Sequence, residues 1–235
     1  MVRAAGASIR VVKESPSLRE LTTQTLRDAI LKMHFKPGQR LVERQLCEET
    51  GVSRTCVREA LQHLESEGLV ERVANRGLFV ASVSAEEARQ IYEVRAALES
   101  EFARLFVERA TDRDLEALQA ALTRLEKAID RKPVIAYVEA LDGFYEVILR
   151  GANNEVARAT LRTLGARISY LRALTTQASP PGREQETASL MRGIYEAAAK
   201  RDGTSIAARC RAFVERSAKF AVQVLKDQEA KAPAA

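Results

Sequence analysis

The sequence predicts a mostly α-helical protein in two parts. We expect an N-terminal winged helix-turn-helix of three helices and a two-stranded wing, followed by an antiparallel bundle of about six helices. Three observations lead to this prediction: apolar residues recur at helical spacing through most of the chain, two short strand-like runs stand between residues 69 and 81, and strand signals are nearly absent from 85 to 226. A chain of 235 residues is long enough for two modest domains.

The first helix is predicted to begin at a capping box formed by Ser17 and Glu20, and to end at the turn Lys36-Pro37-Gly38. The second helix is short and is expected over residues 41 to 50. We expect four segments along the chain: a flexible tail (1–15), the winged helix-turn-helix (16–82), the helical domain (83–226) and a second flexible tail (227–235).

The third helix has one apolar face and one polar face. Its apolar stripe comprises Val57, Ala60, Leu61 and Leu64, at the spacing i, i+3, i+4, i+7. The opposite side carries Arg54, Thr55, Arg58 and Gln62. Gly51 supplies the left-handed end of the preceding helix and Ser53 an N-cap, which makes the unit a helix-turn-helix. A recognition helix presents such side chains to base edges and phosphates in the major groove.

Two apolar strands follow Gly68, with the sequences LVER and GLFVA. They are joined by residues 73 to 76, and Gly77 frees the backbone at the bend. The unit is therefore predicted to be a winged helix.

The rest of the chain reads as six helices, which can form a bundle with a cavity between them. Ser84 and Glu87 make a second capping box at the start of the first of these helices. The expected helices span 85–109, 112–131, 134–150, 154–177, 184–201 and 204–226.

Composition and charge indicate a cytoplasmic protein that binds DNA at defined sites. No apolar run has the length of a membrane span, and residues 1 to 17 lack a signal-peptide core. Three unpaired cysteines fit a reducing compartment; a redox pair of Cys47 and Cys56 is conceivable, but packed side chains are the preferred interpretation. The net charge is +5, and residues 1–81 hold 13 Lys and Arg against 10 Asp and Glu. This mild surplus argues against a polycation that coats DNA.

Enzymatic activity is not expected. Both histidines, His34 and His63, lie in the first half of the chain, and no nucleophile-base pair or Gly-rich phosphate loop is evident. The segment GANN at 151–154 reads as a helix-capping turn rather than a phosphate cradle.

Four segments resemble consecutive signatures of the GntR family of bacterial transcription regulators, in its FadR-like branch with an FCD-type helical domain. These segments are KPGQRLVERQL, GVSRTCVREALQHLESEGLV, NRGLFV and IYEVRAALES. The resemblance covers roughly residues 18 to 220. It implies a homodimeric regulator, more often a repressor than an activator, that reads an inverted-repeat operator and responds to an effector.

The resemblance also implies which residues contact DNA. Arginines at the positions of Arg44, Arg54 and Arg58 contact DNA in the family, and the wing tip matching Arg76-Gly77 reaches toward the minor groove. The alternative is that Arg44 and Arg58 only pair with neighbouring glutamates such as Glu48 and Glu59. The candidate DNA-binding residues are Arg44, Ser53, Arg54, Thr55, Arg58, Arg76 and Gly77.

In most members of this branch, the resemblance implies, a divalent metal is held by one Asp and three His. The corresponding positions here are Leu141, Tyr145, Met191 and Phe213. Asp142 is one residue out of register, about 100° round the helix. These side chains offer no donor set for zinc or manganese, so no metal cofactor is expected.

Two interpretations of that replacement remain open. In one, the site has become a mostly apolar pocket for a carboxylate effector with a ring or a short acyl body. In the other, the same side chains close the core, the helical domain only dimerises, and the protein is a ligand-independent repressor or an architectural DNA binder. Arg95 could also simply pair with Glu99 along its helix. The candidate pocket residues are Arg95, Leu141, Tyr145, Arg167, Met191, Tyr195 and Phe213, with Tyr170 a further possibility.

Overall fold

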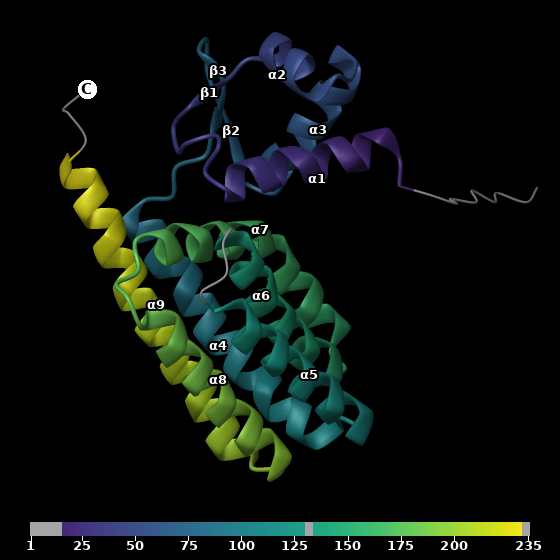
Figure 1. Ribbon diagram of the computed structural model, residues 1–235, viewed down its shortest axis with the longest axis vertical. Coiled ribbons are helices and arrows are strands. Elements are labelled where there is room, and N and C mark those ends of the chain that lie inside the picture. The colour runs from purple at the N-terminus through teal and green to yellow at the C-terminus, as the bar shows by residue number, and fades with distance from the viewer. Residues whose placement is uncertain (1–15, 130–133, 232–235) are drawn as a thin grey trace, which may run out of the picture.

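The computed structural model describes residues 16–129 and 134–231 and has two stacked halves (Figure 1). A small helical unit with a β-sheet lies above a bundle of longer helices. The predicted N-terminal tail, and residues 232–235 of the predicted C-terminal tail, lie outside the described residues. None of the described helices has the length and apolar content needed to cross a membrane.

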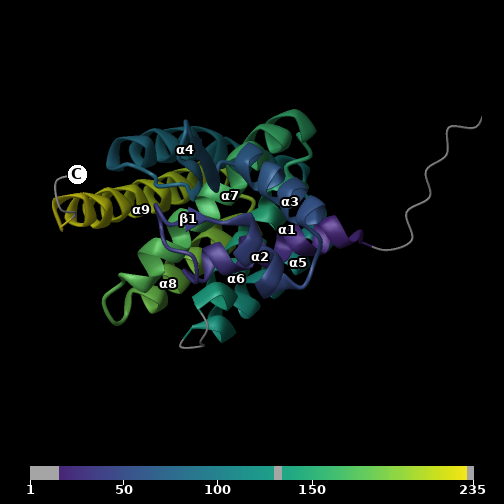
Figure 2. The same ribbon diagram turned by 90° about the horizontal axis from the view of Figure 1, so that it is seen from above.

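The N-terminal half has the predicted three helices, but its sheet has three strands. Its elements are α1 (Leu18–Leu31), β1 (Arg40–Leu41), α2 (Glu43–Thr50), α3 (Arg54–Ser66), β2 (Val70–Val73) and β3 (Gly77–Val80). The strands are antiparallel in the order β1-β3-β2. The apolar stripe predicted for α3 is fully buried, with each of its four side chains at most 1% exposed. Figure 2 looks down on this half, with the bundle behind it.

Strand β1 is an addition to the prediction, and it corrects the start of the second helix. Leu41 pairs with Leu78 of β3 instead of opening a helix, and α2 begins at Glu43. The turn before it uses Gly38 at φ 71°, whose N–H donates to the Val80 carbonyl at 3.0 Å. A strand of two residues is too short to show the period-2 pattern by which strands are predicted.

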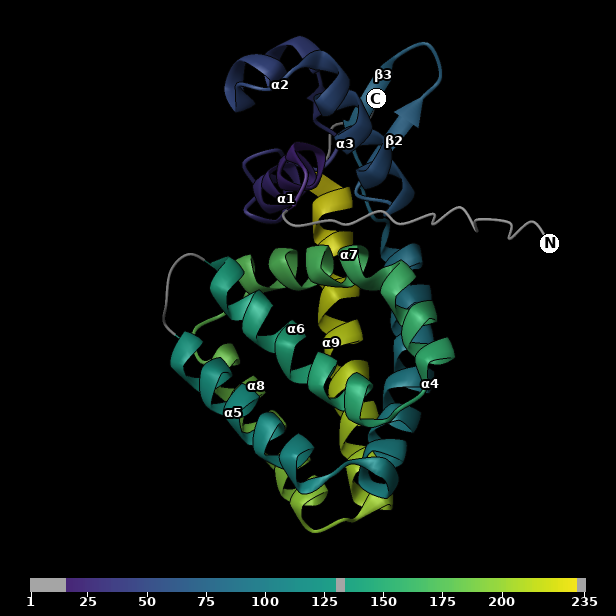
Figure 3. The same cartoon turned by 90° about the vertical axis from the view of Figure 1, so that its right-hand side faces the viewer.

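The second half is an all-helical bundle, as predicted. Its helices are α4 (Ala85–Arg109), α5 (Asp112–Ala128), α6 (Val134–Gly151), α7 (Glu155–Gln177), α8 (Arg183–Ala199) and α9 (Gly203–Lys231). The predicted end of α5, residues 130 and 131, falls outside the described residues. α4 and α9 pack against each other over much of their length, and α7 crosses the top of the bundle beneath α1 (Figure 3).

Helix α9 runs further than the sequence indicates. It continues to Lys231, through part of the tail expected to fray from residue 227. Its extension places the Glu229 carboxylate 2.9 Å from the backbone N–H of Ala85, where it accepts a hydrogen bond. An acceptor at a helix N-terminus satisfies a free N–H group and interacts favourably with the helix dipole, so the last turns of α9 are tied to the start of α4.

Side-chain caps begin several helices at the predicted positions. Ser17 and Glu20 form the complete capping box of α1, and the Ser53 hydroxyl accepts from the Cys56 N–H at 3.3 Å. Only half of the second predicted box forms: the Ser84 hydroxyl accepts from the Glu87 N–H at 3.0 Å. The Glu87 carboxylate pairs with Arg167 of α7 rather than returning to Ser84, because that guanidinium lies within 3.0 Å.

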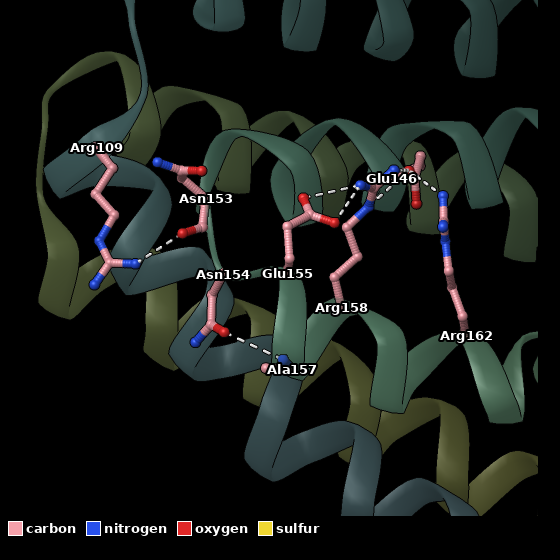
Figure 4. A network of polar contacts seen from close by, with 8 residues as sticks. All are labelled: Arg109, Glu146, Asn153, Asn154, Glu155, Ala157, Arg158 and Arg162. Atoms are coloured by element: carbon pink, nitrogen blue, oxygen red, sulfur yellow. Dashed lines mark hydrogen bonds and ion pairs between the residues drawn. The ribbon is translucent and has the colours of Figure 1, made fainter. Parts of the chain in front are cut away.

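The corner between α6 and α7 is a capped turn, as predicted for the segment GANN (Figure 4). The Asn154 side chain accepts from the Ala157 N–H at 3.1 Å. Arg109 of α4 donates to the Ala152 carbonyl at 3.0 Å, and Arg158 joins Glu146 to Glu155. Carbonyl and amide groups of the turn are thereby engaged in holding three helices together.

The two halves meet where α7 passes beneath the N-terminal unit. Besides its ion pair with Glu87, Arg167 lies against Gly68, directly after α3. A Cβ atom at Gly68, which has a φ of +72°, would be 2.2 Å from the Arg167 Nε. A side chain at position 68 would therefore occupy the space of the guanidinium.

Candidate nucleic-acid interface and helical-domain cavity

The first turns of α3 present polar side chains to solvent. Arg54, Thr55 and Arg58 are exposed, while Cys56 and Val57 between them are buried. The Cys56 sulfur lies 3.3 Å from the Thr22 hydroxyl of α1, inside the core of the N-terminal unit. All three cysteines are free thiols. The burial of one face leaves the other available for an external partner.

Arg58 is held by a carboxylate of the neighbouring helix. Its Nε and Nη2 donate to the two Glu43 oxygens at 3.1 and 3.0 Å. The hydrogen bond from Arg58 lowers the pKa of Glu43 below its ordinary value, and the charges of Arg54 and Arg72 add to this effect. Three arginines thus converge on one carboxylate. Sequence reasoning named Glu59 as the partner and missed Glu43, because that contact depends on the angle between α2 and α3.

The other candidate arginines differ in how they are held. Arg44 lies 3.8 Å from Glu48 in an exposed pair, which is the alternative foreseen for it and which contributes little to stability. Among the residues that the structure describes, neither Arg54 nor Arg76 has a carboxylate within ion-pair distance. Arg76 lies 5.8 Å over the ring of Phe79. These guanidinium groups are free to meet phosphates or base edges.

Arg40 is a further cation at the wing, and sequence reasoning missed it. The pairing of β1 with β3 brings its Nε to within 3.6 Å of where a Cβ atom at Gly77 would lie. Its side chain is exposed. Since β1 itself could not be predicted, no sequence signal connected residue 40 with the wing.

A small cavity of about 40 Å³ lies between the helices of the second half. Its lining includes the guanidinium-bearing Arg95, Arg172 and Arg183 and the apolar Leu141 and Phe213. Seven hydroxyl-bearing side chains complete much of the wall, from Tyr92 on α4 to Ser217 on α9. Four helices and the start of a fifth therefore contribute to one polar cavity.

Two of these arginines are almost fully buried and each has a carboxylate partner. The Arg95 side chain is 1% exposed and donates from Nε to Glu99 at 2.7 Å, as the intrahelical alternative anticipated. Arg172, 8% exposed, pairs through Nη1 with Asp142, which also accepts from the Ser169 hydroxyl at 2.5 Å. Burial, with a smaller contribution from the charge of Arg95, lowers the pKa of Arg172 to about 10.

The residues predicted to form one pocket lie in different places. Arg95, Leu141 and Phe213 line the cavity, whereas Tyr145 lines a neighbouring groove of about 300 Å³ beside α6 and α7. Met191 and Tyr195 line neither of these two hollows; Met191 is fully buried in the core and Tyr195 packs against it. Arg167 also lines neither, because it faces α4 and the N-terminal half. Tyr170 lies at a hollow near the hinge between the halves.

The positions that resemble metal ligands hold side chains unsuited to a metal. Leu141, Tyr145, Met191 and Phe213 are each at most 4% exposed, and the rings of Tyr145 and Phe213 stack with centroids 6.0 Å apart. Burial raises the pKa of Tyr145 well above its ordinary value, which disfavours a phenolate ligand. Within the described residues no group of three or more His, Cys, Asp or Glu side chains could hold a metal ion. The donor set does not fit zinc or manganese.

Family models match both halves of the chain. Residues 18–80 match the model of the bacterial regulatory proteins of the gntR family, and residues 90–216 match the FCD domain. The boundary between the two matches falls at the junction of β3 and α4.

Named relatives and a solved structure agree with these matches. The chain is 35% identical over 153 residues to the Nta operon transcriptional regulator of Aminobacter aminovorans, covering 65% of this chain and 72% of the relative. It is 29% identical over 185 residues to the HTH-type transcriptional repressor RspR of Escherichia coli, covering 77% and 78% of the two chains. The structure of E. coli McbR/YncC superposes with a TM-score of 0.74 at 24% identity, over 92% of this chain and all of the other, and shows a shared fold.

Proposed function

The chain belongs to the GntR family of bacterial regulatory proteins, with an FCD domain as its second half, and from this premise we propose how it regulates transcription. As a DNA-binding regulator it acts as a cytoplasmic homodimer whose two winged helices read an inverted repeat. Arg54, Thr55 and Arg58 lie at base edges or nearby phosphates, with Arg76 alongside at the wing. The observation that carries this proposal is the exposed cationic start of α3 opposite its fully buried stripe.

Regulation is proposed to be repression that a small carboxylate effector relieves. The relative RspR is named a transcriptional repressor, which supports this sign of regulation. The effector would bind in the helical half, where α4 and α7 both border the cavity and both contact the N-terminal half. A ligand shifts the spacing of the two winged helices only if it binds one arrangement more tightly than the other.

Replacing Arg58 with alanine tests the DNA-reading surface. We expect Arg58→Ala to weaken binding to the operator by roughly 5- to 150-fold if the side chain reads a base. The measurement is fluorescence anisotropy with a duplex selected from fragmented genomic DNA of the source organism. Arg192→Ala is the matched control, because it also removes an exposed, ion-paired arginine but lies on α8. Equal affinities for wild type and Arg58→Ala would remove Arg58 from the interface.

We also propose that the FCD half works without a metal. Treatment with EDTA followed by gel filtration should leave the melting temperature unchanged, because no ligand that stabilises the native state is removed. Elemental analysis of the untreated protein should find no stoichiometric zinc, manganese or nickel. A stoichiometric metal, or a lower melting temperature after EDTA, would show that other residues form a metal site.

The second candidate is a ligand-independent repressor or an architectural binder. The complete burial of Met191 and the stacking of Tyr145 on Phe213 favour it, because these contacts fill the region that an apolar effector would occupy. Genomic selection separates the possibilities. A sharp inverted repeat that is lost in Arg58→Ala supports a specific regulator, whereas diffuse and salt-sensitive enrichment that survives the substitution supports an architectural binder.

A further inference from the structure

Three guanidinium groups converge on the small cavity of the helical half. Arg95 comes from α4, Arg172 from α7 and Arg183 from α8. The first two are more than nine-tenths buried, and Arg183 is half-buried. Buried cations are costly unless negative charges and hydrogen-bond acceptors surround them. Their number in so small a space therefore points to an anionic partner.

The protein's own carboxylates leave donors of this cluster unused. Arg95 is paired with Glu99, and Arg172 with Asp142 through Nη1 alone. No hydrogen bond within the described chain engages Nε or Nη2 of Arg172. Arg183 has no carboxylate at ion-pair distance among the described residues, and its guanidinium is instead held 3.8 Å over the ring of Phe220. The cavity thus keeps free charged N–H groups.

The remaining wall favours a small ligand that is rich in oxygen. Seven hydroxyl groups can donate hydrogen bonds to acceptor oxygens, whereas the apolar lining is confined mainly to Leu141 and Phe213. A volume of about 40 Å³ accommodates about three water-sized groups, far less than a benzene ring requires. The ring or acyl body expected from the sequence therefore does not fit this cavity.

The start of α8 adds positive potential at the same place. Gly182, with φ of +90°, occupies the N-cap position and supplies no side chain to accept from the first N–H groups. The helix that follows is 17 residues long, and its first two residues, Arg183 and Glu184, line the cavity. Helix N-termini stabilise anions through these N–H groups and the helix dipole.

We propose that this cavity binds a compact oxyanion, such as a short-chain carboxylate or a phosphate, held directly by Arg95, Arg172 and Arg183 without a metal. Arginine suits this task because its planar fork binds carboxylate or phosphate oxygens in pairs. The proposal rests on the proposed function for its regulatory role, although binding itself can be tested apart from DNA.

The place of the site on α7 offers a route to the DNA-binding half. Arg172 follows Arg167 by five residues on the same helix, and Arg167 contacts both Glu87 and the backbone at Gly68. An anion that draws Arg172 toward the cavity would thus act on the helix that supports the end of α3. Transmission along one rigid helix needs no other contact.

The experiment measures binding of oxalate, oxamate and inorganic phosphate to the full-length, EDTA-treated protein by calorimetry and thermal shift. Oxalate and oxamate have nearly the same shape but differ by one negative charge, and phosphate distinguishes a general oxyanion site from a carboxylate site. We expect oxalate or phosphate to bind and raise the melting temperature, with oxamate weaker. Arg183→Gln should weaken binding about 10- to 100-fold, since one charge-assisted hydrogen-bonding group is lost. Arg192→Gln, on the same helix outside the cavity, should bind like wild type.

Several results would overturn the proposal. These are no binding of either oxalate or phosphate at millimolar concentration, equal binding of oxamate and oxalate, or unchanged binding in Arg183→Gln. If Arg183→Gln proves unstable, Ser217→Val fills the cavity from α9 without altering charge and should abolish binding. Operator affinity is measured with and without the bound anion. An anion that binds but leaves operator affinity unchanged would contradict the proposed regulation while leaving the site intact.

Discussion

Glu99→Ala is expected to lower the free energy of unfolding by about 3–5 kcal/mol, because it leaves a buried guanidinium without its carboxylate. The Arg95 and Glu99 side chains are 1% and 5% exposed, so solvent cannot replace the lost partner. Burial opposes the positive charge of Arg95, but Glu99 and the neighbouring Tyr92 hold the pKa of Arg95 above its ordinary value. Arginine therefore cannot shed its proton to escape the cost. Urea unfolding followed by circular dichroism measures the change.

Two further variants separate the pair from its surroundings. Arg95→Met combined with Glu99→Leu should recover most of the loss, since apolar side chains of similar volume often replace a buried ion pair without net cost. Glu93→Ala is the matched control on the same helix, because it breaks an exposed pair with Arg89 and should change stability little. A loss in Glu99→Ala no larger than that in Glu93→Ala would show that Arg95 is solvated when its partner is removed.

Gly151→Ala is expected to destabilise the helical half by about 1–3 kcal/mol through overpacking. A Cβ atom at this last residue of α6 would lie 2.5 and 2.6 Å from two ring carbons of Phe106, which is fully buried. The ring would have to shift within a packed core. Replacing glycine with alanine in a helix ordinarily gains at most about 1 kcal/mol, which does not offset this cost. The measurement is again the free energy of unfolding in urea.

The same substitution in the middle of α7 should have the opposite sign. No atom lies within 4 Å of where a Cβ would stand at Gly165. Gly165→Ala should therefore stabilise the protein by roughly 0.5–1 kcal/mol, through reduced backbone freedom in the unfolded chain. If both variants moved stability in the same direction, packing at Phe106 would not be the deciding factor.

Local patterns were sufficient to predict most helices. Ser17, Ser53 and Ser84 cap helices where the sequence places them, and the stripe from Val57 to Leu64 is buried as its spacing requires. Such features depend on residues within a few positions of one another. The two-residue strand β1 and the last turn of α9 depend instead on Leu78 and Ala85, which are distant in the sequence, and no local pattern reveals them.

The candidate sites show the same division. Exposure of Arg54 and Thr55 follows from the period of α3, but the grip of Glu43 on Arg58 depends on how two helices cross. In the helical half, Arg95 was predicted because of its place in a recognisable segment. Arg172 and Arg183 reach the same cavity only through the packing of α7 and α8, and nothing adjacent in the sequence distinguishes them from surface arginines.

The contact of Arg167 with Gly68 has a consequence for chimeric regulators. The two halves share one surface, on which a guanidinium from one half occupies the space that a side chain of the other would need. A fusion that moves residues 16–82 onto a foreign helical domain keeps the bare glycine but loses the guanidinium that covers it. Conversely, this helical domain would accept a foreign DNA-binding half only if that half also leaves the position empty. The DNA-binding half and α7 are thus best exchanged as one unit.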